Sequence, residues 1–337
     1  MGSNAPIDRG PGRVGKWPVI TRQLHGRAMN FRRSDFDVTN RINVTDPVCV
    51  KLEIVRIYKS LYAVGEPVAI SRAFDDAVAL YRGLFPGYSR CDTEYHDLQH
   101  ALEVTLAMAR LLDGYERSRV EGPAIGARLF ELGVVCALYH DIGYIRRAND
   151  TRHTNGAEYT PIHVSRGGRF LRDYLPKLGM EEFADVAGAI LHFTGYETPV
   201  SEIRVPDPIY RLVGTLLGSA DIIGQMSDRC YLEKCRDRLY PEFVAGGITV
   251  RRTEAGEEVV FASGEDLLRK TPGFYKNASK RLDVDLGGAY QYAQAHFGGP
   301  NLYMDAVQQN IRFVEKKTSS GGEIVLRRNP PVTCVRD

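Results

Sequence analysis

The stretch Tyr139-His140-Asp141-Ile142-Gly143 places an imidazole beside a carboxylate at the end of an apolar run, Leu132 to Leu138. The composition of that run predicts a buried helix. Two titratable side chains at its end are costly to bury unless they are paired or bind a metal ion. The doublet of His140 and Asp141 therefore predicts partners elsewhere in the chain.

Histidines are the first candidates for these partners. Six of the eight histidines fall between residues 96 and 192: His96, His100, His140, His153, His163 and His192. Most of them lie on apolar segments of helical period. Clustering of this kind is typical of a transition-metal site.

A carboxylate further along the chain is a second candidate. Asp221 lies within the apolar run Leu216 to Gly224, where an unpaired carboxylate is expensive to ionise. A cation would remove that cost, and so would an arginine partner.

Composition limits the class of protein. The chain has 337 residues, 43% of them hydrophobic, which is enough for one large domain or two modest ones. Lys+Arg number 44 against 42 for Asp+Glu, so the net charge gives no general case for nucleic-acid binding and favours a small-molecule substrate. Six dispersed cysteines without a C-x-x-C pair indicate reduced thiols, and no stretch reaches the roughly 18 apolar residues of a membrane span. We expect a cytoplasmic protein that does not enter a membrane.

The pattern along the chain predicts an all-α fold. Residues 1–45 are basic and rich in Gly and Pro, which indicates a partly ordered arm. Residues 46–317 show apolar spacing near 3.6 and predict a helical domain. Alternation around a glycine turn at about 247–262 predicts a small β-hairpin insertion. Residues 318–337 form a tail.

The spacing of the histidines suggests roles. His96 and His100 are four residues apart and share a face of a helix. Both could bind one metal, or His100 could bind it while His96 donates a proton from just outside. A histidine bonded to backbone at a helix start is the alternative. Adjacent His140 and Asp141 can converge on a metal at a helix end, and the two carboxylate oxygens of Asp141 could bridge two ions.

Two further histidines lie near helix ends. His163 opens the run His163-Val164-Ser165-Arg166-Gly167, and His192 follows the apolar pair Ile190-Leu191. Each could instead be a core histidine satisfied by one hydrogen bond. Their proximity in sequence to the doublet favours metal binding.

These residues, taken in order, resemble a known signature. His100, His140-Asp141 and Asp221 resemble the H…HD…D pattern of the HD-domain superfamily of metal-dependent phosphohydrolases. The run Tyr95-His96-Asp97-Leu98-Gln99-His100-Ala101 resembles the Y-H-N-x-x-H-A motif of class I cyclic-nucleotide phosphodiesterases, with Asp97 where that family has Asn. His163 and His192 resemble the additional histidines of HD-GYP and related two-metal branches.

The resemblance implies an HD-domain helical bundle that holds two divalent ions, whether Mn, Mg, Zn or Fe. It implies metal ligation by His100, His140, Asp141 and Asp221 at the first ion, with Asp141 bridging to a second ion near His163 and His192. His96 would protonate the leaving oxygen, and a metal-activated hydroxide would attack a nucleotide or cyclic nucleotide. The implied activity is that of a phosphodiesterase-like hydrolase.

Three more residues are weaker candidates. Arg229 and Gln225 could contact the substrate, and Glu158 could orient a ligand histidine or a water from behind the ligands. Beyond its phosphoester substrate, the protein could form a homodimer. Two other functions stay open: a mixed-valent diiron oxygenase of the same superfamily, and a nucleotide-sensing protein without catalysis.

Overall fold

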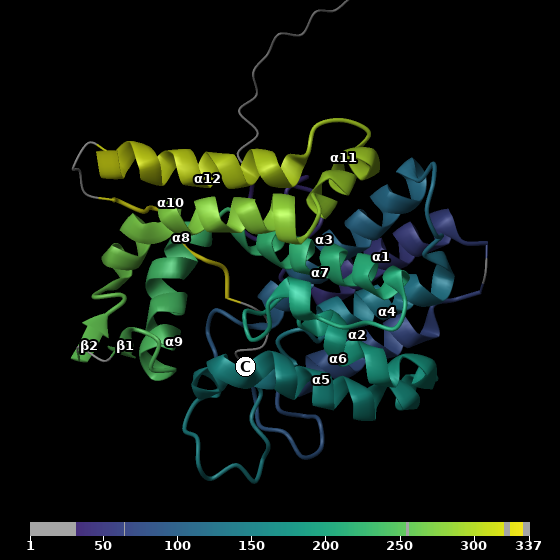
Figure 1. The fold of residues 1–337 in the computed structure, drawn as a ribbon, viewed down its shortest axis with the longest axis horizontal. Helices are drawn as coiled ribbons and strands as arrows, with labels where there is room; N and C mark the ends of the chain where they lie inside the picture. Colours follow the sequence, from purple (N-terminus) through teal and green to yellow (C-terminus); the bar gives the residue numbers. More distant parts are fainter. Residues whose placement is uncertain (1–31, 64, 254–255, 320–323, 333–337) are drawn as a thin grey trace, which may run out of the picture. The chain divides into compact units, whose positions relative to one another are not determined.

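The computed structural model describes residues 32–63, 65–253, 256–319 and 324–332, and most of them are helical (Figure 1). The predicted all-α fold is confirmed. In the described part of the chain the α-helices are α1 (Pro47–Leu61), α2 (Val68–Tyr81), α3 (Leu98–Ser118), α4 (Gly126–Leu138), α5 (His163–Tyr174), α6 (Ala184–Leu191), α7 (Pro208–Ser227), α8 (Tyr231–Lys234), α9 (Tyr240–Ala245), α10 (Gly264–Lys280), α11 (Tyr292–Phe297) and α12 (Leu302–Ser319).

Side-chain caps explain where the long helices begin. The carboxylates of Asp46 and Asp207 each accept a backbone hydrogen bond at the start of α1 and α7, and a proline occupies the first turn of both helices. Asp97 caps α3 by accepting from the backbone N–H of His100 at 3.0 Å. The aspartate that departs from the Y-H-N-x-x-H-A motif therefore fixes the helix turn that carries His100.

The core of the described body is built around α3. This helix packs against α1, α4, α7 and α11, and α7 also contacts α6 and α12. Every side chain of α3 from Leu98 to Ala101 is buried, and the apolar run Leu132 to Leu138 of α4 is buried throughout. The doublet of His140 and Asp141 at the end of α4 thus lies in the interior of the bundle, as the apolar run predicts.

The predicted hairpin is also confirmed. Strand β1 (Val250–Thr253) pairs antiparallel with β2 (Gly256–Val259), with Val250 opposite Val259. Its turn residues 254–255 lie outside the described residues. Helix α10 follows the hairpin and runs beside α12 (Figure 1).

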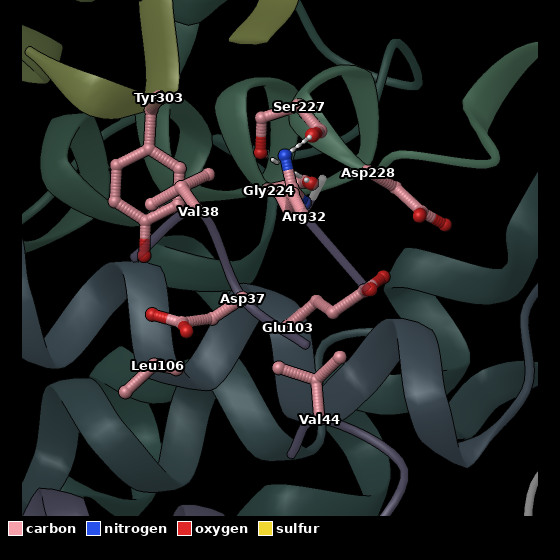
Figure 2. A pocket seen from close by; sticks show the side chains of 10 residues that line it. All are labelled: Arg32, Asp37, Val38, Val44, Glu103, Leu106, Gly224, Ser227, Asp228 and Tyr303. Atoms are coloured by element: carbon pink, nitrogen blue, oxygen red, sulfur yellow. Dashed lines mark hydrogen bonds between the residues drawn. The ribbon is translucent and has the colours of Figure 1, made fainter. Parts of the chain in front are cut away.

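Residues 32–45 belong to the compact body, although the sequence assigned them to an arm. Asp37 is buried and lies 2.5 Å from the guanidinium of Arg110, which also donates to the Tyr303 hydroxyl at 2.9 Å. Arg32 donates to the backbone carbonyl of Ser227 at 2.8 Å (Figure 2). These contacts tie the segment to α3, α7 and α12. The rest of the predicted arm, residues 1–31, lies outside the described residues.

The segment after α7 is buried despite its many charges. Charged side chains are frequent in residues 228–238, a pattern typical of a solvated helix, yet Tyr231 to Cys235 are buried. Lys234 lies 2.5 Å from Asp228 and 3.6 Å from Glu103 of α3. A buried lysine is stabilised only by such carboxylates, and one of the two comes from a distant helix.

Membrane crossing finds no support in the helices. Within the ranges that the structure describes, no helix has the length and apolar character required to span a bilayer.

Candidate metal centre

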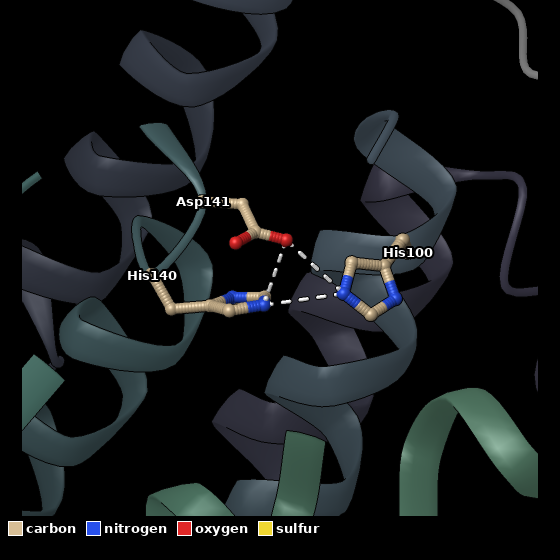
Figure 3. Close-up of side chains that lie close together, drawn as sticks. All are labelled: His100, His140 and Asp141. Atoms are coloured by element: carbon tan, nitrogen blue, oxygen red, sulfur yellow. Dashed lines mark hydrogen bonds and ion pairs between the residues drawn. The ribbon is translucent and has the colours of Figure 1, made fainter. Parts of the chain in front are cut away.

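Three side chains converge at the end of α4. His100 projects from the first turn of α3, while His140 and Asp141 lie in the turn that leads from α4 into the short 3₁₀ helix Ile142–Tyr144 (Figure 3). Their exposed fractions are 4%, 1% and 4%. Among the described residues, these three bring ligand atoms within 4.8 Å of one another.

The distances define a compact set of ligand atoms. The Nε2 atoms of His100 and His140 are 3.2 Å apart, and Asp141 Oδ2 lies 3.2 Å from the first and 3.1 Å from the second (Figure 3). Asp221 of α7 brings its Oδ1 atom to 3.6 Å and 3.7 Å from the same two nitrogens. The four residues predicted to hold the first ion therefore lie together.

The hydrogen bonding of this set fits a cation. The Nδ1 atom of His140 is 2.8 Å from the carbonyl oxygen of Ala137, to which it donates, so Nε2 carries the free lone pair of the neutral ring. No described residue donates a hydrogen bond to Asp141 Oδ2, although this oxygen is buried. Lone pairs directed at one point, without a donor between them, are what a divalent ion requires.

His140 and Asp141 shift each other's pKa. Burial lowers the pKa of His140, but the Asp141 carboxylate outweighs that effect and raises it to about 9. Burial also acts to raise the pKa of Asp141, yet the imidazoles of His140 and His100 hold it well below its usual range. In the metal-free protein, protons on the imidazoles therefore balance the carboxylate charge, and a divalent ion would take the place of those protons.

His163 lies on the far side of Asp141. It is the first residue of α5, its Nδ1 donates to the carbonyl oxygen of Thr160 at 2.7 Å, and its Nε2 is 3.6 Å from Asp141 Oδ1. The two oxygens of Asp141 thus face different histidines. Tyr144 stacks between His163 and His96, with ring centroids 4.4 Å from each.

His96 is held outside the ligand cluster. Its Nδ1 lies 2.6 Å from Glu242 Oε2, and the other oxygen of Glu242 accepts from the backbone N–H groups of Tyr95 and His96. Burial lowers the pKa of His96, but the Glu242 carboxylate reverses this and raises it to about 9. The ring is therefore a charged proton donor near neutral pH.

His192 is less closely tied to the cluster. It follows α6, and its Nδ1 is 4.0 Å from Glu197 Oε2 without a hydrogen bond from any described residue. Glu197 accepts from the backbone N–H of Val164 at 2.9 Å and from the hydroxyl of Ser165. Glu197 therefore links His192 to the start of α5, where His163 lies.

Of the three weaker candidates, only Gln225 lies at the site. Gln225 lines the cavity described below; it donates to Asp221 at 3.1 Å and accepts from the Tyr95 hydroxyl at 3.1 Å. Arg229 and Glu158 are not among the described residues that line this cavity. The Glu158 carboxylate is used locally, since it accepts from Thr154 and Asn155 in a capping box at the start of a 3₁₀ helix.

Three residues of the site have no counterpart among the sequence candidates: Tyr144, Glu197 and Glu242. The sequence indicates only that Tyr144 follows Asp141 by three positions, not that it contacts the histidines. Glu197 and Glu242 carry no motif; Glu197 follows His192 closely, whereas Glu242 meets His96 across 146 residues of sequence. Only the fold reveals them.

The ligand cluster opens into a cavity of about 510 Å³. Asp141, His100, His96, His163 and Asp221 line one end of it. The volume falls within the roughly 300–1,000 Å³ of small-molecule sites. A candidate metal centre therefore lies at the end of a cavity large enough for an organic substrate.

No protein-family model matches the chain, and no curated protein matches it. The resemblance to the HD-domain superfamily stays a prediction that rests on the ordered motif residues.

Proposed function

We propose that this protein is a cytoplasmic, metal-dependent phosphohydrolase that cleaves a small phosphoester, with nucleotides and cyclic nucleotides as the first candidates from the motif. The observation that carries the proposal is the convergence of His100, His140, Asp141 and Asp221 on one point at the end of a cavity. The five cysteines within the described ranges are free thiols, which agrees with a reducing compartment.

His100, His140, Asp141 and Asp221 would hold the first divalent ion. A bound divalent ion supplies Lewis acidity at phosphorus and lowers the pKa of a water. Asp141 would bridge to a second ion, because its Oδ1 faces His163 while its Oδ2 faces His100 and His140. Mn, Mg, Zn and Fe all fit a set of imidazole and carboxylate ligands.

His96 would serve as the general acid. Glu242 binds its Nδ1 and keeps the ring protonated, so the proton on Nε2 is available for the leaving oxygen. Stacking of the ring on Tyr144, with planes 15° apart, limits its rotation. The chain therefore orients the donor from two sides.

Replacement of Asp141 tests the proposal. Asp141→Ala should abolish both metal binding and hydrolysis of a panel of cyclic nucleotides, nucleoside monophosphates, dinucleotides and simple phosphoesters. Asp173→Ala, an exposed carboxylate on α5 away from the cluster, is the matched control and should keep both. Retained hydrolysis in Asp141→Ala, or no metal-dependent hydrolysis in the unaltered protein, would contradict the proposal.

A diiron oxygenase is a second candidate, favoured by the lining of the cavity. Lys270 is the one lysine or arginine among the described lining residues, whereas phosphate groups usually meet several cations. Histidine-rich ligand sets also suit iron. Metal analysis of protein purified without added metal, with spectroscopy for a coupled iron pair, separates the two functions. Redox-silent or mononuclear metal would rule the oxygenase out.

A further inference from the structure

Apart from the metal ligands, much of the cavity lining is apolar. This apolar wall is formed by the segment from α8 to α10, which contributes Leu239, Phe243, Ile248, Phe261, Leu267 and Phe274. The rings of Phe243 and Phe261 stack with centroids 5.5 Å apart and planes 27° apart. This wall combines side chains of the π-helix Cys235–Leu239, of α9, of the segments on either side of the β-hairpin and of α10. The ligand cluster does not require such a wall.

The three threonine hydroxyls on the cavity surface already donate hydrogen bonds within the protein. Thr160, Thr194 and Thr271 donate to the backbone carbonyl oxygens of Ala157, Leu191 and Leu267. Each threonine hydroxyl therefore donates its hydrogen to a carbonyl oxygen of its own helix or turn. A polar substrate group would find few side-chain donors there.

The amide and the ammonium group of the lining are also engaged. Gln225 is bonded to Asp221 and to Tyr95. Lys270 donates to the Val260 carbonyl at 2.7 Å and to Asp266 at 2.9 Å. Both groups already have partners within the protein, so few of their hydrogens remain for the edge of a base or the hydroxyls of a sugar.

We infer that the substrate is a phosphoester whose organic group is a hydrocarbon, with the phosphate at the metal ligands and the hydrocarbon against the wall of Phe243 and Phe261. This inference rests on the proposed phosphohydrolase function. Burying hydroxyl or amide groups against such a wall costs free energy because their bonds to water are not replaced. Burying methylene groups there is favourable. Hydrolysis joins a water oxygen to phosphorus and breaks the bond to the alkyl oxygen, which takes a proton and leaves as an alcohol.

A series of n-alkyl phosphates tests the inference. Ethyl, butyl and hexyl phosphate have nearly the same leaving-group reactivity, so differences in kcat/KM report contacts with the hydrocarbon. Each buried methylene should raise kcat/KM by about fourfold. Hexyl phosphate has four more methylenes than ethyl phosphate, so its kcat/KM in the Mn-loaded protein should be higher by about 250-fold if all four are buried and by about 16-fold if two are. It should also exceed that of adenosine monophosphate. The series is run as monoesters and as methyl diesters.

Substitution of the wall provides the matched variants. Phe243→Ala should reduce the ratio of kcat/KM for hexyl over ethyl phosphate several-fold. Val244→Ala, the next residue of α9, is exposed and does not line the cavity, so it should leave that ratio unchanged. An equal ratio in Phe243→Ala and the unaltered protein would count against the assignment of the wall.

The outcomes separate this inference from the proposed function. Absence of Asp141-dependent hydrolysis for every phosphoester would contradict the function. Hydrolysis that is flat or falling with chain length, or a preference for adenosine monophosphate, would overturn the inference alone. Binding of ethyl and hexyl phosphonate, which cannot be hydrolysed, is measured by calorimetry in parallel. Equal affinity for the two phosphonates would overturn the inference whether or not turnover is seen.

Discussion

Gly143 sets the distance between the doublet and α5, and its replacement gives a sharp prediction. A Cβ atom at this position would lie 1.8 Å from the carbonyl oxygen of His163, whereas ordinary contact begins at 3.4 Å. In Gly143→Ala the start of α5 must therefore recede by about 1.6 Å or the 3₁₀ helix must distort. His163 Nε2 lies only 3.6 Å from Asp141 Oδ1, so this shift separates the two candidate ligands.

The shift should have three measurable effects. Overpacking of a tight backbone contact costs about 1–3 kcal/mol, measured as the free energy of unfolding by urea titration. A displacement of this size within a catalytic site lowers kcat by about 100-fold. Bound metal, measured by elemental analysis, should also fall.

A glycine without neighbours is the control. A Cβ atom on Gly299 would meet nothing within 4 Å, so Gly299→Ala should change stability and activity little. Wild-type stability, metal content and kcat in Gly143→Ala would refute the role assigned to this close approach.

Three other predictions concern charge and metal. Asp37→Ala leaves the buried Arg110 without its carboxylate and should cost about 3–5 kcal/mol in urea titrations, part of which Arg110→Met in the same chain should restore. In metal-free protein, burial lowers the pKa of His96, but Glu242 outweighs this and raises it from 6.5 to about 9. The resulting stabilisation is fully present below pH 6.5 and is lost as the pH rises through 9. Glu242→Gln should remove this pH-dependent loss of about 3 kcal/mol, measured as the free energy of unfolding across this pH range. Chelation of metal present at 100 times its Kd should lower stability by about 2.7 kcal/mol in thermal scans, and Asp221→Ala should shrink this difference.

Local pattern was sufficient for most of the fold. The 3.6-residue apolar period predicts helices over residues 46–317, and the observed helices begin at Pro47 and end at Ser319, because burial of one face decides helix formation in this body. The hairpin at 250–259 was predictable for the same kind of reason, since alternation around a glycine turn is a local signal. The cluster of His100, His140 and Asp141 was predictable from motif order.

The remaining parts depend on tertiary contacts that no local pattern encodes. Glu242 meets His96 across 146 residues of sequence, and its own surroundings carry no motif. Lys234 belongs to a pattern typical of a solvated helix, yet Asp228 and Glu103 stabilise it in the interior. The attachment of residues 32–45 to the body likewise depends on long-range contacts, those of Asp37 with Arg110 and of Arg32 with Ser227. Composition alone predicts an arm there.

Titration of metal-free protein with Mn²⁺, with bound metal and phosphoester hydrolysis measured in the same samples, tests the central claim most directly. We expect no hydrolysis before metal is added, a rise of activity that follows bound metal, and neither signal in Asp141→Ala. Hydrolysis without metal, or metal bound equally well by Asp141→Ala, would contradict it.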